Sequence, residues 1–258
     1  TTVLEVDLDA LAGNFNILRN RVPKGTRLAV MVKAFSYGSG AGEIAAQLQY
    51  SGADYLMVAY ADEGVELRSK GITVPIAVMN PEPEAFDQMI EFSLEPEIYS
   101  LTLLRDFESV LARNGVEDYP VHLKLNTGMN RSGLDKADIP ELLRFMQGRR
   151  TVMLRSMFSH LAVADEPSED EFTLGQIRLF EEMTGMVQPH FPYKILRHIL
   201  NSAGIERFPQ YAFDMVRMGI GLYGIGPLPG LRPVSTFKTH IASIRRITPD
   251  QTVGYGRK

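Results

Sequence analysis

The chain of 258 residues contains no cysteine, which excludes disulfide bridges and catalysis by a thiolate. It has no apolar run near the roughly 20 residues that a membrane-spanning helix needs, and no secretory signal peptide opens it. An excess of positive charge is also lacking: the formal net charge is −4, which argues against nucleic acid or an anionic membrane as a partner. These absences are typical of a soluble cytoplasmic enzyme, without indicating which one.

Strand-like and helix-like segments alternate along most of the chain. Apolar runs rich in β-branched residues mark the expected strands, at residues 28–32, 55–59, 74–79, 94–99, 121–125, 152–158, 195–199 and 215–220. Segments with helical periodicity lie between them, for example at residues 42–50, 63–70, 101–114, 139–147 and 172–187. About eight such β-then-α units in roughly 200 residues predict a closed (β/α)8 barrel of the TIM type. An open, doubly wound parallel sheet is the alternative.

A lysine ends the first predicted barrel strand. The apolar run Leu28–Val32 reads as a buried strand, and Lys33 follows it directly. Burial of an ammonium is costly, so a lysine at this place is pushed toward the free amine, which can form a Schiff base with an aldehyde cofactor. The alternative is a lysine whose ammonium simply reaches water.

Polar or ionisable residues stand at the ends of five predicted strands. Because barrel active sites gather at the C-terminal ends of the strands, this pattern favours an enzyme over a structural barrel. The residues are Lys33, Lys124, His160, the pair Asn201 and Ser202, and Arg217.

The segment Arg217–Gly224 contains a G-x-G-x-x-G pattern. As a dinucleotide fingerprint it should open a helix, but it runs into a Gly/Pro-rich stretch that cannot be helical. In barrels, phosphate groups bind at the loops after the seventh and eighth strands. The backbone amides of Gly219 and Ile220, with the hydroxyl of Ser202, could therefore cradle a phosphate. Glycines needed only for tight turns are the alternative.

Five motifs together closely resemble the alanine racemase family in order and spacing. They are VKAFSYGSG at 32–40, KLNTGMNRSG at 124–133, SHLAVAD at 159–165, NSAG at 201–204 and RMGIGLYG at 217–224. The resemblance implies a barrel that holds pyridoxal 5'-phosphate (PLP) on Lys33. It further implies that Tyr37, Ser202, Gly219 and Ile220 bind the cofactor phosphate, that His160 and Asn201 line the cofactor, and that Arg217 is the partner of the pyridine nitrogen.

The resemblance also assigns Arg131 to the phenolic oxygen of the cofactor, held in place by Lys124. Two cations side by side disfavour each other, so this pair needs a charge reversal or a trapped anion. In the family the lysine at this position is often carbamylated, which would make it an anionic partner for Arg131. A Lys124 that points to solvent is the alternative. One departure from the family is Asn126, where an aspartate is usual; the lost negative charge is expected to affect Arg131.

Racemisation needs an acid/base on each face of the substrate. Lys33 can serve one face. By the resemblance, the other face is served by a tyrosine from the second domain of the partner subunit, which corresponds here to Tyr255 in the segment VGYG; a turn aromatic flanked by glycines is the alternative. We therefore predict a homodimeric, PLP-dependent alanine racemase that supplies D-alanine for peptidoglycan. A non-catalytic PLP-binding barrel and a PLP amino-acid decarboxylase of the same barrel type stay open.

The chain changes character after Gly230. Residues 234–248 contain β-branched residues and no glycine or proline before Pro249, which predicts a strand leaving the barrel, and the strand-like residues 1–7 are expected to pair with it. The expected domains are a PLP-binding barrel at 8–230 and part of a mainly β domain at 231–258 with 1–7. The family has a complete β domain here, so we expect the chain to be cut within it, impaired in catalysis, and derived from a longer protein, such as a fusion with a cell-wall ligase. The acidic segment 165–171 is expected to cap a helix and to bind no metal.

Overall fold

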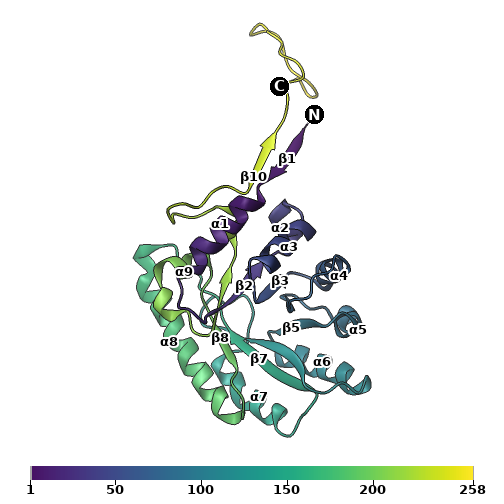
Figure 1. Cartoon of the computed structure of the whole chain (residues 1–258), viewed down its shortest axis with the longest axis vertical. Helices are drawn as coiled ribbons and strands as arrows, with labels where there is room; N and C mark the ends of the chain where they lie inside the picture. The colour runs from purple at the N-terminus through teal and green to yellow at the C-terminus, as the bar shows by residue number, and fades with distance from the viewer. Residues whose placement is uncertain (1, 258) are drawn as a thin grey trace.

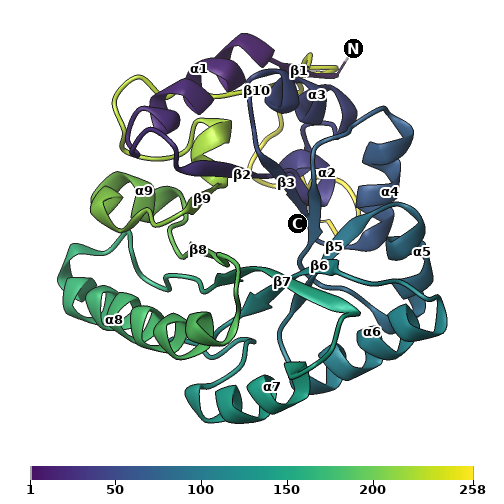
Figure 2. The same ribbon diagram turned by 60° about the horizontal axis from the view of Figure 1, so that its bottom comes forward.

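Eight parallel strands form a closed barrel with helices around its outside (Figure 2). The structure, a computed structural model, describes residues 2–257. The barrel strands are β2 (Arg27–Met31), β3 (Tyr55–Val58), β4 (Ile76–Val78), β5 (Leu94–Ile98), β6 (Tyr119–Lys124), β7 (Val152–Phe158), β8 (Leu196–His198) and β9 (Met215–Met218). The helices are α1 (Leu8–Arg19), α2 (Lys33–Gly38), α3 (Gly42–Tyr50), α4 (Ala61–Ser69), α5 (Phe86–Glu91), α6 (Leu101–Arg113), α7 (Ile139–Met146), α8 (Asp170–Val187) and α9 (Ser202–Arg207).

The barrel closes between its first and last strands. The strand order is β8-β7-β6-β5-β4-β3-β2-β9, so β2 pairs with β9 although they stand far apart in the sequence. Two backbone hydrogen bonds join β8 to β9: the Asp214 N–H donates to the Arg197 carbonyl and the Arg217 N–H to the Leu200 carbonyl, both at 3.0 Å. The predicted barrel is confirmed, and the open sheet is excluded.

Each predicted strand overlaps an observed one, and the periodicity located the helices within a few residues. The helix expected at 63–70 begins two residues earlier, because the Glu63 side chain accepts hydrogen bonds from the backbone N–H groups of Ala59 and Tyr60 and so fixes the start of α4. The hydrophobic periodicity of the sequence does not reveal this start, because the start depends on the hydrogen bonds of a single polar side chain.

Side chains inside the barrel fall into two groups. On one side, Ala29, Met31, Tyr55, Met57, Ala77 and Met215 form a small apolar cluster that is separate from the main core between strands and helices. On the other side the buried residues are polar: Glu95, Glu97, His122, Lys124, Ser156, His198 and Arg217. Barrel interiors are usually filled by bulky aliphatic residues. Part of this interior is instead a network of polar residues that includes Lys124 and Arg217 at the strand ends.

A small antiparallel sheet lies outside the barrel, where β1 (Val3–Val6) pairs with β10 (Ser235–Lys238) (Figure 1). The expected pairing of the opening segment is confirmed. The expected length of the strand at 234–248 is wrong, because residues 239–257 contain no further strand or helix. A two-stranded ribbon has no apolar face against which a longer strand could pack. The isoleucines at 241, 244 and 247 are accordingly exposed. The division into two domains at 230 stays a prediction.

None of the helices in residues 2–257 combines the length and the apolar character that a membrane crossing requires.

Candidate active site

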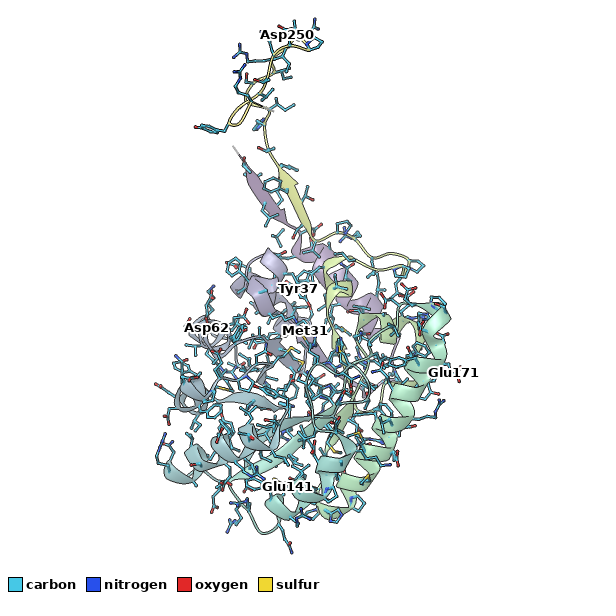
Figure 3. All side chains as sticks on the ribbon, turned by 180° about the vertical axis from the view of Figure 1, so that it is seen from behind. Met31, Tyr37, Asp62, Glu141, Glu171 and Asp250 are labelled. Atoms are coloured by element: carbon cyan, nitrogen blue, oxygen red, sulfur yellow. The ribbon has the colours of Figure 1, made fainter. Side chains whose placement is uncertain are left out.

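The candidate site lies at the C-terminal ends of the barrel strands, on the side that faces the small sheet. Figure 3 shows Tyr37 just beyond Met31, the last residue of β2. Lys33, Lys124 and Arg217 stand at the ends of β2, β6 and β9. The structure therefore brings together the polar strand ends on which the sequence prediction rested.

The segment after Lys33 is a left-handed turn. Ala34, Phe35, Ser36 and Tyr37 all have φ between 52° and 54°. This conformation costs L-residues roughly 1–2 kcal/mol each, so the surrounding structure must hold it in place. The Ser36 N–H donates to the Val32 carbonyl at 3.0 Å, and the Ala34 N–H donates to Glu63 Oε1 at 2.6 Å.

Glu63 joins this turn to the neighbouring strand end. Its Oε2 accepts the Ala59 N–H at 2.6 Å, while its Oε1 accepts the Ala34 N–H. A glutamine offers one acceptor oxygen in place of two. We expect Glu63→Gln to lower the free energy of unfolding by about 1–3 kcal/mol, the cost of a lost hydrogen bond to a charged group. Urea denaturation measures this change.

The matched control is Glu66→Gln, one turn further along the same helix. Glu66 forms an exposed ion pair with Lys70, and exposed pairs contribute about 0–1 kcal/mol. Equal losses in the two variants would contradict the role of Glu63 as the anchor of the turn.

Hydroxyl and amide groups converge between the ends of β8 and β9. The Ser202 Oγ accepts hydrogen bonds from the N–H groups of Gly219 at 3.0 Å and Gly221 at 3.2 Å, which leaves its own O–H free to donate. A Cβ added at Gly219 would lie 3.5 Å from the Tyr37 hydroxyl and 3.8 Å from the Ser202 Oγ. Ile220 begins a short 3₁₀ helix, η6 (Ile220–Tyr223), so its N–H has no partner within that helix. The bare backbone at 219 thus leaves room for an anion between donors.

Backbone geometry explains two glycines of the motif, Gly219 and Gly224. Gly224 has φ 86°, and a Cβ there would lie 2.1 Å from the Arg232 carbonyl oxygen. Gly219 has φ −116° and ψ −115°, a combination that lies outside the α and β regions favoured by residues with a Cβ. The backbone conformation therefore favours glycine at both positions, and at Gly224 the approach of the Arg232 carbonyl adds a steric requirement.

Arg217 is fully buried and almost fully bonded. Its Nη1 donates to His198 Nδ1 at 2.7 Å, and its Nη2 donates to the carbonyls of Ser159 at 2.5 Å and Ile199 at 3.1 Å. Burial lowers its pKa to about 10, so it stays cationic at neutral pH. Its Nε is buried and has no hydrogen-bond partner among residues 2–257. One N–H donor of a fixed guanidinium is thus left for a ligand.

A chain of buried hydrogen bonds runs from Arg217 across the barrel. A guanidinium can only donate, so His198 Nδ1 accepts and its Nε2–H donates to the Ser156 Oγ at 3.0 Å. The Ser156 hydroxyl then donates to His122 Nδ1 at 2.7 Å, and His122 Nε2–H donates to Glu95 Oε2 at 2.8 Å. Burial and the charge of Arg217 lower the pKa of His198, which agrees with its neutral form. The sequence prediction missed this chain.

Lys124 forms a buried ion pair with Glu97. Lys124 Nζ lies 2.8 Å from Glu97 Oε1, and both side chains are more than nine-tenths buried. The Lys124 Nζ also lies 5.8 Å from the centroid of the Phe158 ring, and the guanidinium of Arg217 lies 5.2 Å from the same centroid. Burial raises the pKa of Glu97, and the ammonium of Lys124 opposes that rise. The sequence prediction missed Glu97 as the partner of Lys124.

An alternation of residues could have revealed these groups. In LEPEI at 94–98 and in VHLK at 121–124, apolar and ionisable residues alternate with the period of a strand. One face of each strand therefore carries Leu94 and Ile98, or Val121 and Leu123, toward the helices. The other face carries the ionisable residues into the barrel.

His160 is surrounded by positive charge. Burial and the cations Arg217, Arg131, Lys124 and Lys33, in that order, lower its pKa to about 3. It is therefore neutral at physiological pH, and its Nδ1 accepts from Arg217 Nη2 at 3.2 Å. These four cations lie around His160, so the mouth of the barrel suits a ligand with negative charge.

Arg131 is exposed on the loop that follows β6. Asn126 organises this loop: its Nδ2 donates to Asn130 Oδ1 at 2.9 Å and to Asp135 Oδ1 at 2.8 Å, and its Oδ1 accepts the Asn130 N–H at 3.0 Å. An aspartate cannot make the first two bonds, because it has no hydrogen to donate. Asn126, which stands where the family usually has aspartate, can therefore donate a hydrogen bond to Asp135, and an aspartate at 126 could not.

We expect Asn126→Asp to destabilise the loop. The substitution places a second carboxylate against Asp135 and should lower the free energy of unfolding by about 1–3 kcal/mol at neutral pH, with less loss below pH 4 where carboxylates protonate. Equilibrium denaturation at neutral pH and below pH 4 measures this loss of stability. The double variant Asn126→Asp with Asp135→Asn restores a donor–acceptor pair; failure of this second change to recover stability would contradict the explanation.

Two predicted site residues lie differently from the rest. Asn201 caps helix α9: its Oδ1 accepts the Gly204 N–H at 2.9 Å, and its Nδ2 donates to the Leu161 carbonyl at 3.3 Å. It therefore positions Ser202, the first residue of α9. Tyr255 is fully exposed on the segment that extends away from the barrel, so the single chain does not bring it to Lys33 (Figure 1).

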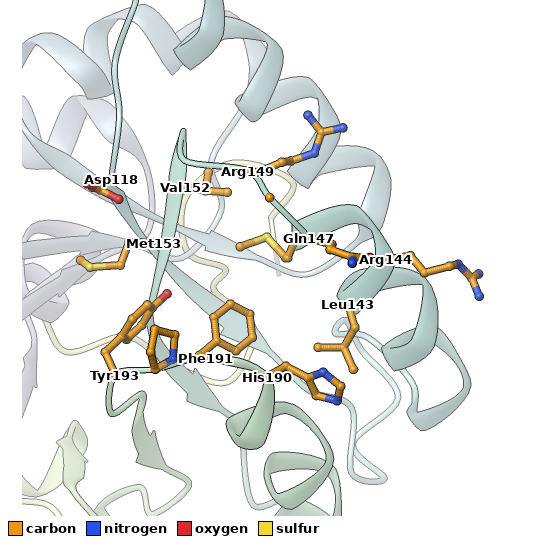
Figure 4. Close-up of a pocket in the computed structure, with 13 residues that line it drawn as sticks. Asp118, Leu143, Arg144, Gln147, Arg149, Val152, Met153, His190, Phe191 and Tyr193 are labelled. Carbon is orange, nitrogen blue, oxygen red and sulfur yellow. The ribbon is translucent and has the colours of Figure 1, made fainter.

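A groove of about 670 Å³ lies at the other end of the barrel (Figure 4). Its lining includes Val152 and Met153 at the start of β7, with Tyr193 and Arg149. Because barrel chemistry takes place where the strands end, this groove is not part of the candidate site. In residues 2–257 no group of three or more His, Asp or Glu side chains is arranged to hold a metal ion.

The fold and the rim together define a β/α-barrel protein with a lysine and a cationic mouth at the ends of its strands. The family model "Alanine racemase, N-terminal domain" matches residues 6–227. An alanine racemase of Synechocystis is 35% identical over 263 residues, covering 99% of this chain and 70% of that protein. One from Geobacillus kaustophilus is 33% identical and covers 99% and 67%. The chain belongs to the alanine racemase family.

Solved structures agree with this assignment. The alanine racemase of Clostridium difficile 630 superposes with a TM-score of 0.90 at 33% identity, covering 100% of this chain and 69% of that one. The alanine racemase of Bacillus anthracis with bound L-Ala-P gives a TM-score of 0.88 at 27% identity, covering 99% and 68%. This chain thus spans about 70% of the length of these relatives.

Proposed function

We propose that this chain is the barrel part of a PLP-dependent alanine racemase, which interconverts L- and D-alanine and so supplies D-alanine for peptidoglycan. The observation that supports it best is the free Nε–H of Arg217, a single buried donor held in place by four hydrogen-bonded neighbours at the strand ends. Family membership supports the same proposal. Alanine is the substrate that this membership favours.

The residues at the rim fit PLP. The convergence of Tyr37, Ser202 and the bare backbone at Gly219 and Ile220 would hold the phosphate. Lys33 would hold the aldehyde carbon covalently, His160 would line the ring, and Arg131 would reach the phenolic oxygen from its loop. When bound, the cofactor withdraws electrons from the α-carbon of the amino acid and weakens its C–H bond.

Arg217 would favour racemisation over other reactions. Its Nε–H can donate to the pyridine nitrogen but cannot give the proton away, because it remains a cation at neutral pH. A carboxylate at this place would instead keep the nitrogen protonated and strengthen electron withdrawal into the ring. With the arginine, return of the proton to the α-carbon is favoured.

Two groups would exchange the α-proton, one on each face. The Lys33 amine would take or return it on one face. Tyr255 of a second copy would serve the other face, which requires the homodimer that the resemblance implies. Tyr255 is fully exposed here and available for such a contact.

Borohydride reduction of the PLP-loaded protein, followed by peptide mass mapping, tests the cofactor site. A pyridoxyl group on Lys33 is the expected result, and an adduct on another lysine or none would contradict the proposal. Product analysis with L-alanine, L-lysine and L-ornithine then separates racemisation from decarboxylation. An adduct on Lys33 with no turnover of any amino acid would favour a PLP-holding barrel without a reaction of its own.

A further inference from the structure

Tyr223 joins two strand ends that meet at the candidate phosphate site. It is the last residue of η6, which follows β9, and its side chain is buried. Its hydroxyl donates to the Met31 carbonyl at 2.9 Å, although 192 positions separate the two residues in the sequence. Met31 is the last residue of β2, two positions before Lys33. The bond therefore links the loop after β9 to the strand that leads into the lysine.

This bond lies just beyond the end of the ladder between β2 and β9. The last pair in their register is Val30 with Met218, so the next pair would be Met31 with Gly219. Gly219 instead leaves the extended conformation. A buried backbone carbonyl needs a donor, and the Tyr223 hydroxyl supplies one. The chain can thus leave the ladder at Gly219 while the end of β2 stays bonded.

The ring of Tyr223 also packs against Tyr37. The ring centroids are 4.8 Å apart, and the ring planes are tilted by 51°. Burial raises the pKa of Tyr37, so its hydroxyl stays protonated and can donate to an anion. A Cβ added at Gly219 would lie 3.5 Å from that hydroxyl and 3.7 Å from Met31 Cγ. Tyr223 therefore contacts the two residues of β2 and its following turn that border the bare backbone at 219.

The short helix that carries Tyr223 is itself held in place by Asn14 of α1. The buried Asn14 Nδ2 donates to the carbonyls of Leu222 at 2.9 Å and Arg232 at 2.8 Å, and its Oδ1 accepts the Arg232 N–H at 2.9 Å. A single 3₁₀ turn has few hydrogen bonds of its own, so its position depends on such outside partners. Asn14 on one element and Met31 on another thus fix η6 within the barrel.

We propose that Tyr223 is a positioning residue for the cofactor phosphate, which holds the Tyr37 hydroxyl at a fixed distance from the bare backbone at Gly219 and Ile220. Donors that are already in place lose little conformational entropy when an anion binds between them. Tyr223 acts through Met31 and Tyr37 and is not itself a phosphate ligand. This inference rests on the proposed function, because it takes the phosphate of PLP as the ligand.

The test compares PLP with pyridoxal, which lacks the phosphate. The full chain is dialysed to equilibrium against a series of concentrations of either compound, which gives a dissociation constant for each. Tyr223→Phe keeps the ring and removes the hydroxyl. We expect it to weaken the binding of PLP about fivefold, the effect of one ordinary hydrogen bond, and to leave the binding of pyridoxal within about twofold of the native value.

Tyr119→Phe is the matched control. Tyr119 is also buried, and its hydroxyl donates to the carbonyls of Met89 and Leu94, both at 2.9 Å. It stands at the start of β6, away from the strand ends that form the site. Tyr119→Phe should leave the ratio of the two dissociation constants unchanged. An unchanged ratio in Tyr223→Phe, or the same change in both variants, overturns the proposal.

A double-mutant cycle asks whether Tyr223 acts through Tyr37. In Tyr37→Phe the hydroxyl that Tyr223 positions is gone. Adding Tyr223→Phe to that variant should therefore weaken the binding of PLP less than it does in the native chain, because the two changes touch one contact. Effects that multiply independently would contradict the proposal.

Hydrogen exchange in the native chain covers the case of a variant that does not fold. Inorganic phosphate should slow exchange in residues 31–38 and 219–224 together, because the Tyr223 bond joins them. Slowing confined to 219–224 overturns the proposal. Since this measurement uses no PLP, it tests Tyr223 even if the native chain binds no PLP and the proposed function fails. Conversely, PLP on Lys33 with an unchanged ratio in Tyr223→Phe refutes the role of Tyr223 alone.

Discussion

Arg217→Ala is expected to lower the free energy of unfolding by about 3–5 kcal/mol, the usual cost of breaking a buried charged network from one side. The guanidinium satisfies the carbonyls of Ser159 and Ile199 and the ring of His198, and all of these acceptors are buried. Removing it leaves them without a donor, and Glu97 loses its second cation.

Equilibrium denaturation in urea measures this loss. Arg197→Ala is the matched control, since Arg197 lies in the neighbouring strand β8 with 40% of its side chain exposed, near Asp214 and Phe213. We expect less than about 1 kcal/mol there. Arg217→Lys should fall between the two, because lysine keeps the charge but cannot replace the planar fork of donors. A loss at Arg217 no larger than at Arg197 would contradict the described network.

The Glu97–Lys124 pair should show strong coupling in a double-mutant cycle with methionine. Either single change, Glu97→Met or Lys124→Met, leaves an uncompensated charge in the barrel and is expected to cost about 3–5 kcal/mol. The double variant removes both charges of the pair, and Arg217 remains as the buried cation nearby. This double variant should lie within about 1–2 kcal/mol of the native chain, because buried pairs can be replaced by apolar residues of similar volume.

Additive losses are the outcome that would count against a buried pair. Sites that do not touch usually add within about 0.3–0.5 kcal/mol. As a reference cycle, Arg113 and Asp87 form an ion pair with both side chains about two-thirds exposed, for which coupling below about 1 kcal/mol is expected.

The barrel was predictable because its signals are local and repeated. Each strand is a short apolar run, and each run overlaps an observed strand. Lys33, Lys124, His160 and Arg217 could be found for a related reason: a polar residue at the end of an apolar run stands out, and the barrel topology gathers such ends at one rim.

The partners of those residues were not predictable in the same way. Glu97 meets Lys124 across two strands, and His198 meets Arg217 across two more, so their contacts depend on register and on which face each strand turns inward. The sequence also contains no sign that Ala34 to Tyr37 form a left-handed turn, since none of the four is glycine. That conformation depends on Glu63, about 30 residues further along the chain.

The pairing of β2 with β9 also has a consequence for the synthesis of this protein. Arg27 pairs with Met215, so the edge of β2 is made roughly 190 residues before its partner, or about 10–40 s earlier at ordinary translation rates. During that interval the nascent chain carries an open strand edge beside apolar residues, which is the kind of surface that invites association. The ribosome-bound half-barrel is thus the stage at which this chain has the greatest need of a chaperone.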